Sequence, residues 1–409
     1  MRRLLSLEKH GARRFQGFDR IISRYSVEAR FLLRCCGSNL AVLCGNDPSR
    51  LDFDWNWFAA AAIRHQAAPQ AVAHITELGL TNRHSTIATM VRNCHANLLR
   101  NLVHLRELKR IAAAFSNAAI PLIAVKGPVL AVLAYGDPLF RVFADLDILV
   151  RERDLEGAAT LLGVLDYRSE NYDLAAIRSR YFNIVEAEFR HLETSVMVDL
   201  HWRLSPFHYA FGPNGDEVFE RTIAVDLEDV PIPALSFEDL TIYLCVHASR
   251  HGWPSLSQVC DIARLAPHAE RCDWRLVNER AMATGALRML RVGVLLAEGL
   301  IGAEFPNEVI AAAHDDHASL TLAHRIAASM FTVHERATAD LFKIGLNAID
   351  TRRDRVRYCA VHLLTPTILD RSYCRLPKGL LPLYYVLRPI RIALQYLRSF
   401  GRHGIPCRR

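Results

Sequence analysis

The chain of 409 residues lacks features that mark several classes of protein. None of its ten cysteines forms a CxxC pair, and no run of eighteen apolar residues free of charge occurs. His247 and His251 are four residues apart, but the glutamate of an HExxH motif is absent between them. We therefore expect no zinc ribbon, no zinc site on that histidine pair and no membrane span.

The cysteines and the start of the chain predict a cytoplasmic protein. Most cysteines lie in apolar segments, as reduced thiols of a protein core do. The basic start of the chain reaches Glu8 and Lys9 before an apolar segment forms, so we expect no signal peptide.

Positive charge is concentrated at the end of the chain. The net charge is +7, yet residues 351–409 carry thirteen Lys and Arg against two Asp, which is +11. The first 350 residues are therefore net acidic. Two interpretations are open: a solvated basic helix surface, or a contact with a polyanion, either nucleic acid or anionic lipid headgroups.

Hydrophobic spacing divides the chain into helical, mixed and loop-rich segments. Apolar residues recur at helical spacing on both sides of a stretch in which short β runs alternate with helices. We expect a basic N-terminal arm (1–20), an N-terminal helical region (21–118), an α/β core (119–203), a loop-rich linker (204–235) and a C-terminal helical domain with a basic tail (236–409). The fold class is α+β, with a mixed sheet in the core.

Three aspartates of the core are expected to meet. Asp145 and Asp147 begin a predicted strand, 145–150, and share one of its faces because successive side chains alternate. Asp199 lies in a second predicted strand, 196–202, on the face opposite its large apolar residues. Neighbouring carboxylates repel one another, and a hard divalent cation is one solution.

This set of side chains is what two-metal nucleotidyl transfer requires. Mg²⁺, or Mn²⁺ in its place, would be held by Asp145, Asp147 and Asp199, and would bind the phosphates of a nucleoside triphosphate (NTP). Gly127 would let the backbone approach phosphate. For Lys126 the alternatives are a phosphate ligand or a surface lysine.

Two further residues near the aspartates have alternative roles. Arg141 is either a phosphate ligand or a structural ion pair to Asp145 or Asp147. His201 shares the face of Asp199 and is either a nucleotide-pocket residue or a hydrogen-bonded structural histidine.

Four segments resemble the bacterial uncharacterised nucleotidyltransferase family of the polymerase-β-type superfamily. They are residues 122–128 (LIAVKGP), 135–138 (YGDP), 141–150 (RVFADLDILV) and 198–204 (VDLHWRL). The resemblance implies a minimal nucleotidyltransferase fold with a metal-dependent triad at Asp145, Asp147 and Asp199. One feature departs from the wider superfamily, where a Gly-Ser or Gly-Gly pair stands nearer the aspartates; here Lys126-Gly127 precedes Asp145 by eighteen residues.

These observations favour a metal-dependent enzyme that transfers a nucleoside monophosphate from an NTP to a hydroxyl or phosphate and releases pyrophosphate. The acceptor is open: a small molecule, a glycan precursor, a peptide or RNA. One alternative is a toxin-like or regulatory enzyme that modifies RNA or protein, with the basic tail as its docking surface. Another is a catalytically degenerate protein that only binds nucleotide.

Overall fold

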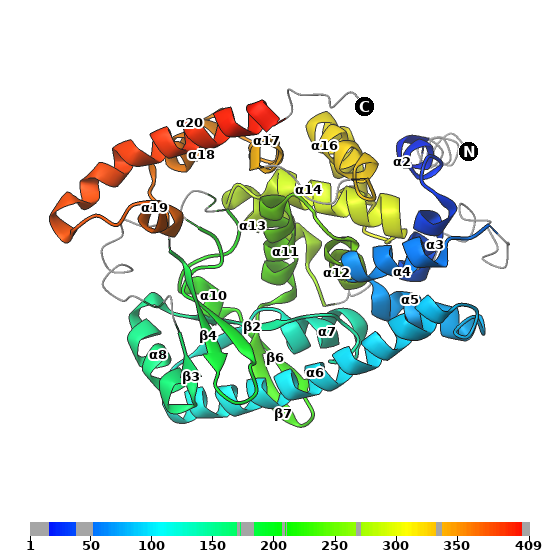
Figure 1. Cartoon of the computed structure of the whole chain (residues 1–409), viewed down its shortest axis with the longest axis horizontal. Coiled ribbons are helices and arrows are strands. Elements are labelled where there is room, and N and C mark those ends of the chain that lie inside the picture. Colours follow the sequence, from blue (N-terminus) through cyan, green and yellow to red (C-terminus); the bar gives the residue numbers. More distant parts are fainter. Residues whose placement is uncertain are drawn as a thin grey trace.

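A computed structural model describes most of the chain (Figure 1). The described residues are 16–37, 52–169, 172, 184–206, 209, 211–266, 271–332 and 338–402. Most of the predicted N-terminal arm (1–20) lies outside them, and its last residues belong to helix α2 (Gln16–Ile22).

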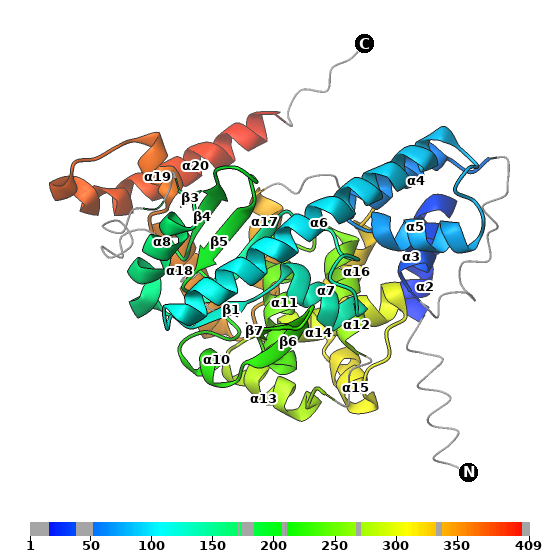
Figure 2. The ribbon, with the colours of Figure 1, turned by 90° about the horizontal axis from the view of Figure 1, so that it is seen from below.

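The first part of the chain is helical, as predicted. Side-chain caps begin three of its helices: Ser26 accepts from Ala29 N, Asp54 accepts from Asn56 N and Trp57 N, and His84 accepts from Thr86 N. Helix α6 is amphipathic and crosses the sheet in Figure 2, where it contacts β2 and β7. Besides α2, the helices are α3 (Val27–Cys36), α4 (Trp55–Arg64), α5 (Ala68–Glu77) and α6 (Ser85–Asn117).

Seven strands form one mixed sheet in the order β3-β4-β5-β2-β1-β7-β6. Strand β2 pairs parallel with β5 and antiparallel with β1, which confirms the α+β class with a mixed sheet. The strands are β1 (Leu122–Ala124), β2 (Asp145–Val150), β3 (Tyr167–Arg168), β4 (Glu186–His191), β5 (Met197–His201), β6 (Ile223–Leu227) and β7 (Val230–Ala234).

The prediction of a loop-rich linker over 204–235 is wrong for the second half of this segment. Strands β6 and β7 form a hairpin there, and Ala234 joins it to β1 beside Ala124. The turn is Glu228-Asp229, and both residues have positive φ (52° and 66°) without the glycine or asparagine that usually signals such a turn. The prolines at 231 and 233 pair with β6 and fit because β7 meets β1 only at its end.

Short helices connect the strands and flank the sheet. Helix α7 (Gly127–Tyr135) joins β1 to β2, and α8 (Leu155–Val164) follows the short helix η2 (Glu152–Asp154). Helix α10 (Glu217–Glu220) precedes β6. Helix α7 packs on α12 (Leu256–Leu265), so the core is joined directly to the C-terminal helices.

The C-terminal domain is helical, as predicted, and lies against the sheet on the side opposite α6 in Figure 1. Its helix η5 (Ala297–Ile301) packs on α2 and α3, and its helix α16 (His317–Ala328) packs on α2, so the two helical regions are in contact. Besides α12, its helices are α11 (Phe237–His251), α13 (Trp274–Ala283), α14 (Leu287–Leu296), η5 (Ala297–Ile301), α15 (Asn307–Asp315), α16 (His317–Ala328), α17 (Thr338–Asn347), α18 (Arg352–Leu364), α19 (Ile368–Tyr373), η6 (Lys378–Leu383) and α20 (Tyr384–Arg402).

Two other expectations from the sequence can be compared with the structure. Within the described ranges, every helix is too short or too polar to cross a bilayer. Of the eight cysteines in those ranges, five are buried. Cys44 and Cys407 lie outside the described residues.

The contact of α14 with α11 gives a test of the packing. A Cβ at Gly293 would lie 2.5 Å from Cys245 Sγ and 3.3 Å from the Trp253 ring. We expect Gly293→Ala to destabilise the protein by about 1–3 kcal/mol through overpacking, measured as a lower midpoint of chemical unfolding.

Gly163→Ala is the matched control for that substitution. Gly163 also lies inside a helix, but the atom nearest to a Cβ there is Arg168 Nη1, at 3.8 Å. Helix propensity alone should therefore leave the control neutral or slightly stabilised. Equal stability of the two variants would contradict the packing of α11 on α14.

Candidate active site

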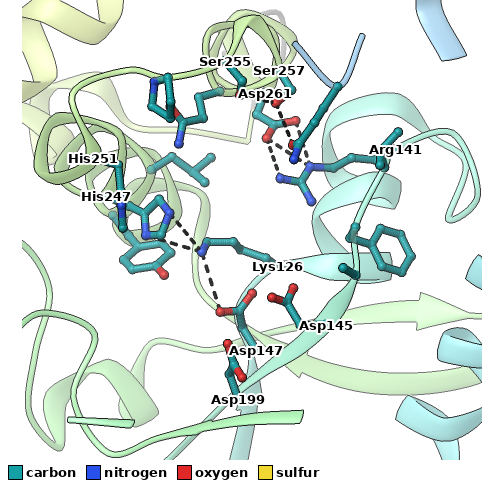
Figure 3. Close-up of a pocket in the computed structure, with 18 of the residues that line it drawn as sticks. Lys126, Arg141, Asp145, Asp147, Asp199, His247, His251, Ser255, Ser257 and Asp261 are labelled. Atoms are coloured by element: carbon teal, nitrogen blue, oxygen red, sulfur yellow. Dashed lines mark hydrogen bonds and ion pairs between the residues drawn. The ribbon is translucent and has the colours of Figure 1, made fainter. Parts of the chain in front are cut away.

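The parallel pairing of β2 and β5 brings the predicted aspartates together. Asp147 lies opposite Asp199 in the register of the two strands, and Asp145 lies two residues before Asp147 on the same face. Figure 3 shows the three carboxylates close to one another at the floor of a cavity. The predicted proximity of Asp199 to the Asp-x-Asp pair is confirmed by this register.

Burial and mutual repulsion act on two of the carboxylates. Burial, and then the charge of Asp147, raise the pKa of Asp145 above its ordinary value. Burial, and then Asp147 and Asp145, raise the pKa of Asp199 to about 7. Negative charge is thus concentrated on the floor of the cavity. A cation bound among the carboxylates would reduce their mutual repulsion.

Asp147 is the carboxylate that already has cationic partners. Its Oδ1 lies 3.6 Å from Lys126 Nζ and 3.0 Å from His201 Nε2. Burial opposes its ionisation, but Lys126 and His201 outweigh burial and hold the pKa of Asp147 well below its ordinary value. Asp147 is therefore ionised and fixed in place.

His201 lies between two carboxylates. Its Nε2 contacts Asp147, and its Nδ1 lies 3.2 Å from Glu186 Oε2 on the neighbouring strand β4. Burial opposes the charge, but the hydrogen bonds to Asp147 and Glu186 raise the pKa of His201 to about 9. Of its two expected roles, these contacts support that of a hydrogen-bonded histidine, although its side chain also borders the cavity.

The Lys126-Gly127 pair forms the entry to helix α7. Gly127 has a φ of +59°, a left-handed conformation that other residues adopt with strain, so the tight turn out of β1 requires glycine. This turn directs Lys126 into the cavity, where it lies over the Tyr243 ring and 3.4 Å from both His247 ring nitrogens. Lys126 is 12% exposed, so it is not the surface lysine of the alternative interpretation.

Opposing effects keep Lys126 charged and His247 neutral. Burial opposes the ammonium, but the Asp147 carboxylate raises the pKa of Lys126 above its ordinary value. Burial, and then the charge of Lys126, hold the pKa of His247 well below its ordinary value. A neutral imidazole can accept a hydrogen bond from the ammonium, and this contact joins α11 to the core.

Arg141 forms an ion pair on the wall of the cavity. Its Nε lies 3.0 Å from Asp261 Oδ2, and its Nη2 lies 3.0 Å from the same oxygen. Tyr135 donates to Asp261 Oδ1 at 3.0 Å. The expected structural alternative, a pair to Asp145 or Asp147, is wrong because Asp261 of helix α12 is the partner.

Helix α6 fixes the loop that carries Arg141. The Asn101 side chain, which is fully buried, donates to the carbonyl oxygens of Leu139 and Arg141 at 3.1 and 2.8 Å. His104 Nε2 lies 3.1 Å from the Ala144 carbonyl oxygen, one residue before β2. Helix α6 thus positions the loop that carries Arg141.

The cavity lies between the sheet and the C-terminal helices and has a volume of about 520 Å³, within the range of small-ligand sites. Carboxylates form its floor, while cations and histidines line the walls (Figure 3). The helical side chains that border it come from α4, α11 and α12 and the loops next to them: Arg64, Gln66, Tyr243, His247, Arg250, His251, Ser257, Gln258 and Asp261.

The carboxylates suit a divalent cation. Among the described residues, one group of three candidate ligands has its atoms within 4.8 Å of one another, and it consists of Asp147, Asp199 and His201. Carboxylate oxygens are the ligands that Mg²⁺ and Mn²⁺ prefer. Because both His201 nitrogens already contact carboxylates, we assign the ligand role to the aspartates and an orienting role to His201.

Three side chains that shape this site have no role predicted from the sequence: Asp261, Tyr243 and Glu186. A signal for Asp261 exists, because it is a single acid among Leu256, Val259 and Ile262 on a mostly apolar helix, and it is 1% exposed. A buried acid requires a partner, and the buried Arg141 supplies it. Tyr243 and Glu186 carry no comparable local signal.

The comparisons with known proteins agree with this geometry. The family model described as "Uncharacterised nucleotidyltransferase" matches residues 52–302, which include helices α4 to α14, the whole sheet and all the side chains of the cavity. No curated protein matches the chain. Since the matched segment is well over half of the chain, this protein belongs to the uncharacterised nucleotidyltransferase family.

Proposed function

We propose that the protein is a metal-dependent nucleotidyltransferase that transfers a nucleoside monophosphate from an NTP to a hydroxyl or phosphate acceptor and releases pyrophosphate. The observation that carries the proposal is the register of β2 and β5, which places Asp147 beside Asp199, with Asp145 on the same face. The family match supports the same reaction class.

Asp145, Asp147 and Asp199 would hold the metal, Mg²⁺ or Mn²⁺. When bound, the metal supplies positive charge that stabilises the attacking oxygen and the departing pyrophosphate. Asp147 is held by Lys126 and His201, so its carboxylate is oriented before any ligand arrives. Asp199 is not held in this way by Lys126 and His201. We assign it to the side of the acceptor hydroxyl, whose proton it would accept.

Lys126, Gly127 and Arg141 would bind the triphosphate. Lys126 and Arg141 are both charged, are each 12% exposed, border the same cavity and lie on the same side of the aspartates in Figure 3. Little reorganisation is needed to bind phosphate, because each side chain is already fixed by a partner. The backbone at Gly127 lies at the start of helix α7, where N–H groups favour anions.

A second candidate function is nucleotide binding without transfer. One observation favours it: Lys126 and His201 both reach the same Asp147 oxygen, and these cations already neutralise much of the charge that a metal would meet. Turnover separates the two functions, since a binding protein releases no pyrophosphate. A toxin-like or regulatory enzyme acting on RNA or protein would use the same cavity and differs only in its acceptor.

We place the activity in the cytoplasm. The support is the set of free thiols, among them the buried Cys36, Cys245 and Cys260, which a reducing compartment preserves.

Neutralising the aspartates tests the reaction. We expect Asp145→Asn and Asp147→Asn each to lower the rate of nucleoside monophosphate transfer to the acceptor by about a hundredfold or more, because the charge that holds the metal is lost. The assay uses NTP labelled on the α-phosphate, with cell extract, RNA and small-molecule pools as acceptors. Asp226→Asn is the control, since Asp226 is an exposed acid on β6 of the same sheet. Wild-type rates in both site variants would refute the proposed chemistry.

A charge-neutral change of the Arg141–Asp261 pair tests the triphosphate site separately. In Arg141→Gln/Asp261→Asn neither partner is left as an unpaired buried charge, so the fold should persist. Nucleotide affinity should fall about tenfold, because one phosphate ligand is lost. Mn²⁺ affinity without nucleotide, measured by electron paramagnetic resonance, should stay unchanged. Unaltered nucleotide affinity in a folded double variant would assign Arg141 a purely structural role.

A further inference from the structure

Helix α20 exposes its apolar side. The residues concerned recur at three- and four-residue steps and are between 36% and 60% exposed, and we call them the apolar stripe: Leu383, the last residue of η6, and Val386, Leu387, Ile390 and Leu394 of α20. Helices of globular proteins normally bury such a side against the core. Packing within the chain therefore does not explain why the stripe is exposed.

The opposite side of α20 faces the protein and carries charge. Arg388 is 6% exposed; its Nη1 lies 3.0 Å from Asp370 Oδ2, and its Nη2 donates to the His362 carbonyl oxygen at 2.7 Å. Arg391 Nε lies 2.5 Å from Asp370 Oδ1. Tyr384 is fully buried and donates to the Cys374 carbonyl oxygen.

These contacts fix the orientation of the helix. If α20 rolled to bury the stripe, Asp370 would lose two arginine partners and would be left as an unpaired charge beside α18 and α19. Figures 1 and 2 both show α20 at the periphery, next to α18 and α19 and away from the sheet. The ion pairs of Arg388 and Arg391 with Asp370 therefore hold the helix with its apolar side directed outward.

The surroundings of the stripe are strongly basic. Residues 351–409 carry a charge of +11, and their two acids are Asp354 and Asp370. Asp370 is paired as above, and Asp354 accepts a hydrogen bond from Thr351. Arg352, Arg353 and Arg375 are exposed. An exposed apolar side on a helix within a basic segment is the pattern of interfacial membrane helices.

We propose that α18–α20 dock on an anionic phospholipid surface, with the apolar stripe in the headgroup region and the basic residues against lipid phosphates. This surface is independent of the cavity and of the reaction proposed for it. A second copy of the chain does not suit the stripe, because two segments of charge +11 repel each other. Nucleic acid would match the charge but would leave the stripe in water.

Vesicle co-sedimentation tests the proposal with the full chain. The probes are large unilamellar vesicles of phosphatidylcholine, either alone or with about one-third phosphatidylglycerol. We expect binding to the anionic vesicles that weakens with salt and is about tenfold lower on the neutral ones. Val386→Gln/Ile390→Gln should reduce binding about tenfold by removing inserted apolar groups. Arg352→Glu/Arg353→Glu should reduce it through charge.

The matched control is Val164→Gln/Met282→Gln. Val164 and Met282 are 73% and 65% exposed but lie on α8 and α13, so this double variant should bind vesicles like the wild type. Circular dichroism checks that each variant is folded.

Three results would overturn the proposal. The first is absence of binding to anionic vesicles, and the second is equal binding by the stripe variant and the wild type. The third is a wild-type dimer that the stripe variant converts to monomer, measured by light scattering, which would make a second copy the occupant. RNA binding that is equal for the stripe variant and the wild type, together with weak binding to anionic vesicles, would overturn the proposal in the same way as the first result.

Discussion

The site is built around three carboxylates that are forced together on two interior strands of the sheet. Parallel pairing of β2 with β5 sets Asp147 against Asp199, and the two-residue period of a strand adds Asp145. Their repulsion must be balanced, and the surrounding chain supplies cations at short range. Lys126 and His201 balance the charge of Asp147, whereas burial, and then the neighbouring carboxylates, raise the pKa values of Asp145 and Asp199.

The same electrostatic requirement joins the core to the C-terminal helices. Arg141, from the loop before β2, pairs with Asp261 of α12, and Lys126, from the turn after β1, contacts His247 of α11. Each of these two contacts spans the cavity between the sheet and the C-terminal helices. The C-terminal helices thus complete the candidate site, since they supply the partners that orient Lys126 and Arg141.

Local sequence pattern was enough to predict the strands that carry the acids. Strand β2 has the predicted bounds, 145–150, because its alternation of acids with Leu146, Ile148 and Val150 leaves one face to bury. The position of Asp199 followed from the same alternation. The β6–β7 hairpin was missed because its turn uses Glu228-Asp229 and its second strand contains prolines, both of which are typical of loops.

Contacts between distant segments could not be predicted in the same way. Asp261 lies 120 residues after Arg141, and His247 lies 121 residues after Lys126. Each pairing depends on how α11 and α12 pack against the sheet, which no local period encodes. The outward orientation of α20 is similar, because it follows from ion pairs to Asp370 rather than from the amphipathic pattern, which alone predicts burial of the leucines.

The most direct measurement is a crystal structure of the protein with Mn²⁺ and an NTP analogue that resists cleavage between the α- and β-phosphates, with diffraction data collected at the manganese absorption edge. The account predicts an anomalous peak bounded by Asp145, Asp147 and Asp199, with the triphosphate extending toward Lys126 and Arg141. A nucleotide bound in this cavity without any anomalous peak at the aspartates, or a peak coordinated elsewhere, would contradict the account.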